Sequence, residues 1–253
     1  MEMQQYQVFF CLSLLGLLLR LRTCRAIDFC DIPSCQEKTH IGCNNSLIFN
    51  VDKCLRFNGL VNMQSFRQYL LTEHNKYRQD VASGRLNHLP TAQKMPELVW
   101  DDYLALLAEY HLKSCQMHLP TNSCVATDDF PQPRSNYGED FFPRPHKRQS
   151  NVRPLTGLIE EWMDEIYELQ ALDSEMAGDN IANIITDRCT HMGCAAGQDY
   201  DLWNVHFALV CYYSAGPPPH GTLYEPGSFN VSLCAHGKSQ GYPNLCKTLP
   251  LNH

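Results

Sequence analysis

The feature that most constrains this chain is a dense set of cysteines that follows a short apolar segment near its start. Residues 8–19 read VFFCLSLLGLLL, which is too short to cross a bilayer and stands where a secretory signal peptide would. Cleavage after Ala26 would remove two of the 13 cysteines and leave eleven. Because a secretory leader implies an oxidising compartment, this density predicts a disulfide framework with one cysteine left over. An uncleaved membrane anchor is the alternative interpretation of the leader.

Other sequence features agree with a protein outside the cell. Asn44 (NNS) and Asn230 (NVS) are glycosylation acceptors. A zinc site is the competing interpretation of clustered cysteines, but no CxxC pair occurs in the sequence. No second apolar segment approaches the roughly 20 residues that a spanning helix needs. We therefore expect residues 1–26 to be a signal peptide and the mature protein to be secreted, with no membrane span.

The charge balance disfavours two classes of partner. The net charge is −7 and the basic residues do not cluster into one face. The chain therefore lacks the electrostatic pattern of a protein that binds nucleic acid or an anionic membrane. One basic run, RPHKR at residues 144–148, stands among prolines and is predicted to be an exposed loop.

Hydrophobic periodicity predicts several helices. Apolar residues recur at helical spacing over 63–82, 97–115 and 155–166, where Pro154 precedes the third pattern at a position that a helix accepts. A short fourth helix is predicted around residues 181–185.

The rest of the chain has other patterns. Residues 125–153 contain several prolines and no sustained period, which predicts an irregular surface connection. Residues 191–196 and 205–213 are apolar runs rich in β-forming residues and separated by a polar turn, which predicts two buried antiparallel strands. Helices that flank a small central sheet form an α/β layered sandwich.

Several segments have a spacing typical of one known family. They are EHNKYRQDVASG (73–84), MPELVWDDYLALLAEYHLKSCQM (95–117), YGED (137–140), EWMDEI (161–166), and THMGCAAG (190–197) followed by FALVCYYSAGP (207–217). In this order they resemble the CAP superfamily of cysteine-rich secretory proteins, antigen 5 and pathogenesis-related class 1 proteins. DFCDIPSC (28–35), HIGC (40–43) and GYPNLC (241–246) resemble its insect antigen 5 branch in particular.

The resemblance implies a fold and a set of disulfides. The fold is a three-layer α-β-α sandwich over residues 61–216, with a cysteine-rich extension over 27–60 and a cysteine-containing tail over 217–253. Cys189 is left unpaired, and for Cys194 with Cys211 the two predicted strands point to the same pair. The implied pairs are Cys30–Cys43, Cys35–Cys124, Cys54–Cys115, Cys194–Cys211 and Cys234–Cys246.

The resemblance also implies a central cleft, in which two histidines and two acids of the family hold a divalent cation. His118, Glu139 and Glu165 match three of these positions, and Asn180 stands where the family has its second histidine. Because a neutral amide oxygen is a poor zinc ligand, we expect no tightly held metal and no cofactor. The alternative for both glutamates is an ordinary role in which they cap a helix, form an ion pair or face water.

The sequence therefore favours a secreted, non-enzymatic protein that acts as an extracellular binding or signalling module with a protein partner. It contains no GxSxG, HExxH or Walker-type glycine motif. A lipid or sterol carrier is the alternative, since some CAP proteins hold lipids. A metal-assisted hydrolase that uses His118 and the two glutamates is less favoured. Venom, saliva, gut and reproductive fluid remain equally open as the place of action.

Overall fold

The structure is a computed structural model that describes residues 28–45, 48–54, 57–86, 88–144, 151–169, 171–173, 175 and 177–251. The predicted signal peptide lies outside these residues, as does most of the basic run at 144–148. The helices are α1 (Arg67–Ser83), α2 (Asp102–Lys113), α3 (Val152–Asp164) and α4 (Asp179–Ile185), and the 3₁₀ turns are η1 (Pro33–Cys35), η2 (Met63–Ser65), η3 (Glu165–Tyr167) and η4 (Val231–Leu233). The strands are β1 (Thr39–His40), β2 (Phe57–Leu60), β3 (Val99–Trp100), β4 (Ser123–Cys124), β5 (Arg134–Pro143), β6 (His191–Tyr200) and β7 (Asn204–Tyr213).

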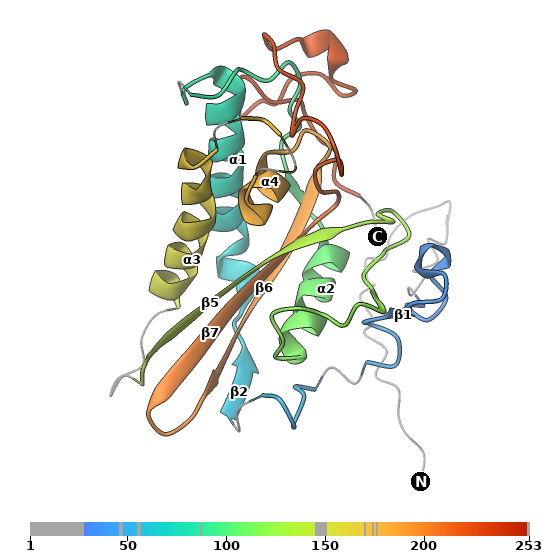
Figure 1. Cartoon of the computed structure of the whole chain (residues 1–253), viewed down its shortest axis with the longest axis vertical. Helices are drawn as coiled ribbons and strands as arrows, with labels where there is room; N and C mark the ends of the chain where they lie inside the picture. Colours follow the sequence, from blue (N-terminus) through green and yellow to red (C-terminus); the bar gives the residue numbers. More distant parts are fainter. Residues whose placement is uncertain are drawn as a thin grey trace, which may run out of the picture.

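Five of these strands form a central sheet that helices cover on both faces (Figure 1). The order is β2–β6–β7–β5, and β3 pairs with β6 on the same edge as β2. Helices α1, α3 and α4 pack on one face and α2 packs on the other. The expected three-layer α-β-α sandwich is thereby confirmed.

The side chains of β7 alternate between two hydrophobic cores, because successive residues of a strand point to opposite faces. Phe207, Leu209, Cys211 and Tyr213 belong to the core under α1, α3 and α4. Ala208, Val210 and Tyr212 belong to the core under α2. This alternation decides on which side of the sheet every polar residue of the central strands lies.

Local signals explain where two helices begin and end. The carboxylate of Asp101 accepts a hydrogen bond from the Leu104 N–H (2.8 Å), which caps the start of α2. The second helix was predicted from residue 97, but Val99 and Trp100 instead form β3 beside β6. In the opposite layer, α1 ends at Gly84, whose φ of +74° suits a glycine.

The prediction of an irregular connection over 125–153 is wrong for its middle part. Residues 134–143 form β5, which pairs antiparallel with β7 from Arg134↔Tyr213 to Pro143↔Asn204. Prolines at 131, 133 and 143 obscure the strand pattern in the sequence, but β5 is an edge strand, where Pro143 is tolerated. Pairing with a distant strand therefore outweighs the local signal.

The structure contains the five disulfides that the family resemblance implied: Cys30–Cys43, Cys35–Cys124, Cys54–Cys115, Cys194–Cys211 and Cys234–Cys246. Cys189 is a free, buried thiol. Among the residues described, no helix is long and apolar enough to span a membrane.

Candidate functional site

Glu165 and Asn180 meet on the face of the sheet that α3 and α4 cover. The Asn180 side-chain amide donates to Glu165 Oε1 (2.6 Å), and the Ile181 N–H donates to Glu165 Oε2 (2.9 Å). A Cβ on Gly178 would come within 2.6 Å of Oε2, so the backbone of α4 begins directly against the carboxylate. Both oxygens of Glu165 therefore have partners supplied by the start of α4.

A chain of buried amides continues from this contact into the protein. The Asn136 side-chain amide on β5 donates to the Asn180 carbonyl (3.1 Å) and to the Tyr213 hydroxyl (3.2 Å), and Asn183 donates to Asn136 Oδ1 (3.0 Å). The same hydroxyl lies 2.9 Å from Nε2 of His74 on α1. Burial lowers the pKa of His74 to about 4, so its imidazole is neutral. These groups satisfy one another and tie α1, β5, β7 and α4 together.

A second polar group lies on the opposite face of the sheet, where α2 packs; we call Tyr137, Glu139, Asp199 and His206 the histidine cluster. His206 Nδ1 lies 2.7 Å from Asp199 Oδ1, and its Nε2 lies 3.2 Å from Glu139 Oε2. The Tyr137 hydroxyl donates to the same Glu139 oxygen (2.9 Å). The hydrogen bond from His206 to Asp199, and then the interactions with Glu139, raise the pKa of His206 although partial burial opposes them.

Replacing Asp199 with asparagine should lower the pKa of His206 toward its ordinary value of 6.5, because Asp199 is the strongest influence that raises it. Glu139→Gln should lower it less. Since the folded pKa is raised, the cluster stabilises the fold fully below about pH 6.5 and loses this contribution as the pH rises through the folded pKa. An NMR titration of the His206 ring in the wild type and both variants measures the pKa values. Equal values in all three would contradict the assignment.

Among the described residues, His118 forms no hydrogen bond or ion pair with either group. It is exposed in the loop that follows α2. The buried histidine of that region is His111 on α2, whose Nδ1 lies 3.2 Å from the Tyr212 hydroxyl. Its Nε2 faces the carbonyls of Gln116 (3.1 Å) and Met117 (3.2 Å). Burial is the main cause that lowers the pKa of His111. His111 is therefore a structural side chain of α2.

Of the four cleft residues expected from the sequence, the structure brings only Glu165 and Asn180 into contact. Glu139 points to the other face of the sheet because Gly138, the residue before it, faces Leu158 and Trp162 of α3. Within the described part of the chain, no group of three or more His, Cys, Asp or Glu side chains is arranged to hold a metal ion. The sequence did contain a signal for the histidine cluster. Side chains alternate between the two faces of a strand, so His206 is expected on the same face as Ala208 and Val210.

Comparisons with known proteins agree with this architecture. A model of the cysteine-rich secretory protein family (CAP) matches residues 71–213. Tabinhibitin 10 of Tabanus yao is 31% identical over 89% of this chain and 90% of its own length. Venom allergen-1 of Aedes aegypti is 27% identical over 87% of each chain. The crystal structure of a hookworm platelet inhibitor matches 82% of this chain and 99% of its own with a TM-score of 0.51 at 23% identity, which is a likeness of fold.

Proposed function

The chain belongs to the cysteine-rich secretory protein (CAP) family, and we propose that it is an extracellular, non-catalytic protein that acts by binding another protein. The observation that carries this proposal is the state of its two candidate acids. Both oxygens of Glu165 accept hydrogen bonds within the fold, and Glu139 is held by Tyr137 and His206. A general acid or base must reach a substrate proton, and carboxylates that are bound on opposite faces of a sheet favour a structural role.

The names of several relatives support a protein partner. Tabinhibitin 3 of Tabanus yao is 28% identical over 94% of each chain, and its name denotes an inhibitor. Inhibition requires that a protein bind its target. Only the binding of a target protein is extended from these relatives to this chain. The five disulfides favour it as well, because a rigid scaffold presents its loops with little loss of conformational entropy on binding.

A lipid carrier is the competing function, and the described cavities favour it less. A lipid tail needs a largely apolar enclosure. The cavity of about 460 Å³ at the sheet edge has Arg67, Asp102 and Glu109 in its lining. Another of about 490 Å³ is lined by three asparagines and by Asp52 and Lys113 among others.

Affinity capture and lipid extraction separate these functions. The protein is immobilised and exposed to the extracellular fluid into which it is secreted, and a reduced and alkylated sample serves as the unfolded control. We expect a protein partner in near-stoichiometric amount on the folded sample only. Organic extraction of the purified protein should release no stoichiometric lipid. Stoichiometric lipid, or a folded sample that captures nothing beyond the control, would contradict the proposal.

A further inference from the structure

The turn between β6 and β7 presents two large apolar side chains to solvent. Leu202 is 73% exposed and Trp203 is 76% exposed, whereas the other two tryptophans, Trp100 and Trp162, are buried. The turn lies at one end of the central sheet, beyond the helices that cover it (Figure 1). Tight turns between strands are usually built from glycine, asparagine or aspartate. The turn itself therefore does not require a leucine and a tryptophan.

A set of hydrogen bonds fixes the backbone of this turn. Asp201 Oδ1 accepts from the N–H groups of Trp203 (2.7 Å) and Asn204 (2.7 Å), and the Asp201 N–H donates to the Asn204 carbonyl (3.1 Å). The Arg144 N–H, just after β5, donates to the Trp203 carbonyl (2.6 Å), and the Arg144 guanidinium donates to the Asp201 carbonyl (3.3 Å). The guanidinium also lies 4.7 Å from the centroid of the Tyr200 ring. A backbone held in this way loses little conformational entropy when its side chains bind a partner.

Phe141 adds a third exposed apolar side chain at the same end of the sheet. It is 65% exposed, and its ring stacks on that of His206 with the centroids 4.4 Å apart and the planes 9° apart. The two residues are partners in the register of β5 and β7, close to the turn. We call Phe141, Leu202 and Trp203 the tip surface. Large apolar side chains that gather at one exposed place commonly mark a contact with a partner.

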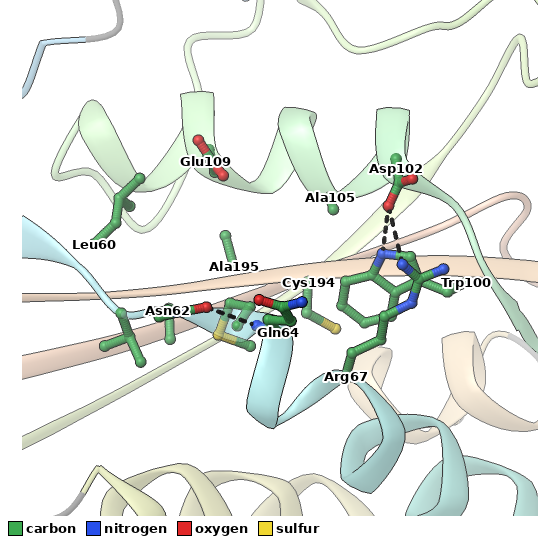
Figure 2. Close-up of a pocket in the computed structure, with 13 residues that line it drawn as sticks. Leu60, Asn62, Gln64, Arg67, Trp100, Asp102, Ala105, Glu109, Cys194 and Ala195 are labelled. Atoms are coloured by element: carbon green, nitrogen blue, oxygen red, sulfur yellow. Dashed lines mark hydrogen bonds and ion pairs between the residues drawn. The ribbon is translucent and has the colours of Figure 1, made fainter. Parts of the chain in front are cut away.

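We propose that the tip surface is where this protein contacts its partner, and that Leu202 and Trp203 insert into an apolar pocket on a partner protein. Tryptophan is enriched among the residues that contribute most to protein–protein affinity, because it supplies a large, rigid contact area at a low cost in conformational entropy. The cavity at the edge of the sheet is less suitable, because Cys194 and Ala195 in its lining are buried (Figure 2). This inference rests on the proposed function, for which it supplies a contact surface.

Charges beside the tip surface favour a protein over a membrane as the partner. Hydrogen bonds from the N–H groups of Asn204 and Trp203 lower the pKa of Asp201, so its carboxylate is ionised next to Leu202. Asp140 on β5 is exposed and forms no ion pair within the described part of the chain. An anionic membrane surface would repel these carboxylates, whereas a protein can place donors opposite them. We therefore expect an apolar pocket that basic or hydrogen-bond-donating groups border.

Substitution of both turn residues tests the tip surface. Leu202→Ser combined with Trp203→Ser removes the apolar side chains and keeps Asp201, whose carboxylate fixes the turn. The matched control combines Val231→Ser with Leu233→Ser, which are 49% and 43% exposed in η4 at the opposite end of the molecule (Figure 1). The protein eluted from the affinity capture should bind the turn variant at least about thirtyfold more weakly, which corresponds to about 2 kcal/mol. It should bind the control as it binds the wild type, and melting temperatures show that both variants are folded.

Fluorine NMR supplies a second measurement on a protein labelled with fluorotryptophan. The three tryptophans give separate resonances, and that of Trp203 is identified by its absence from the Trp203→Ser variant. Addition of the captured protein should change the chemical shift of the Trp203 resonance and leave those of the buried Trp100 and Trp162 unchanged. Vesicles of phosphatidylcholine, with or without phosphatidylserine, should change none of the three.

Two results would overturn the tip surface as a protein contact. One is a captured protein that binds the turn variant as tightly as the wild type. The other is a Trp203 resonance that responds to vesicles and not to the captured protein. Either result would leave the capture of a partner protein valid, whereas a wild type that captures nothing would contradict the proposed function itself. The two proposals therefore fail in distinguishable ways.

Discussion

Replacing Arg78 with methionine should lower the free energy of unfolding by about 3–5 kcal/mol, because several buried carbonyls lose their donor and each buried acceptor left unpaired costs about 1–3 kcal/mol. Arg78 lies on α1 and is fully buried. Its guanidinium donates to the carbonyls of Pro96 (2.9 and 2.7 Å), Ile184 (2.6 Å), Thr186 (2.9 Å) and Cys189 (3.1 Å). Burial lowers the pKa of Arg78 to about 10, so the group stays charged at neutral pH. Methionine would leave these buried carbonyls without this donor.

Two further variants show whether the donors or only the packing matter. Arg78→Lys keeps the charge but supplies donors from a single nitrogen. We therefore expect its free energy of unfolding to lie between those of the wild type and Arg78→Met. Arg85→Met is the control, because Arg85 is exposed near the end of the same helix and its ion pair with Asp80 (2.8 Å) contributes about 0–1 kcal/mol. Chemical denaturation measures all three. A loss below about 1 kcal/mol for Arg78→Met would contradict the assignment of Arg78 as a central structural contact.

Removing the two nested disulfides Cys35–Cys124 and Cys54–Cys115 together should cost about 8 kcal/mol, the largest effect that we expect. The outer bridge spans 89 residues of sequence and the inner one 61. With the inner bridge intact, 28 residues remain in the outer loop. The chain-entropy relation then assigns about 4 kcal/mol to each bridge. Since a domain is stable by about 5–15 kcal/mol, the variant that lacks both should be largely unfolded.

The measurement is the yield and melting temperature of secreted protein with the four cysteines changed to alanine. Removal of Cys234–Cys246 is the control, because its sequence separation of 12 predicts about 3 kcal/mol by the same relation. The control should be recovered folded with a lower melting temperature. A folded variant without the nested bridges, with a loss no larger than that of the control, would show that the extension before residue 60 does not restrain the unfolded chain.

The helices could be predicted where their signal is local. In α3, Leu155, Leu158, Ile159 and Trp162 repeat at helical spacing and all are buried in one core. The strand β5 could not be predicted, because it carries Gly138 and Asp140, which are unfavourable in strands. It forms because β7 offers a full partner far along the chain.

The candidate site was predictable only in part, for a related reason. Motif spacing identified Glu139 and Glu165 as notable acids, but spacing does not report which face of a sheet a side chain occupies. A shift of one residue reverses that face. Glu139 therefore meets His206 on the side of α2, while Asn136 points to the side of α4 and meets Asn180. Both partners come from distant segments, and no local pattern joins them.

The central claim is that this protein binds its partner and does not alter it. The measurement that tests the claim most directly is the intact mass of a captured partner after incubation with a substoichiometric amount of the purified protein. We expect the mass to be unchanged and the partner to be held in a complex limited by the amount of this protein. Cleavage or chemical modification of many partner molecules by each molecule of this protein would contradict the claim.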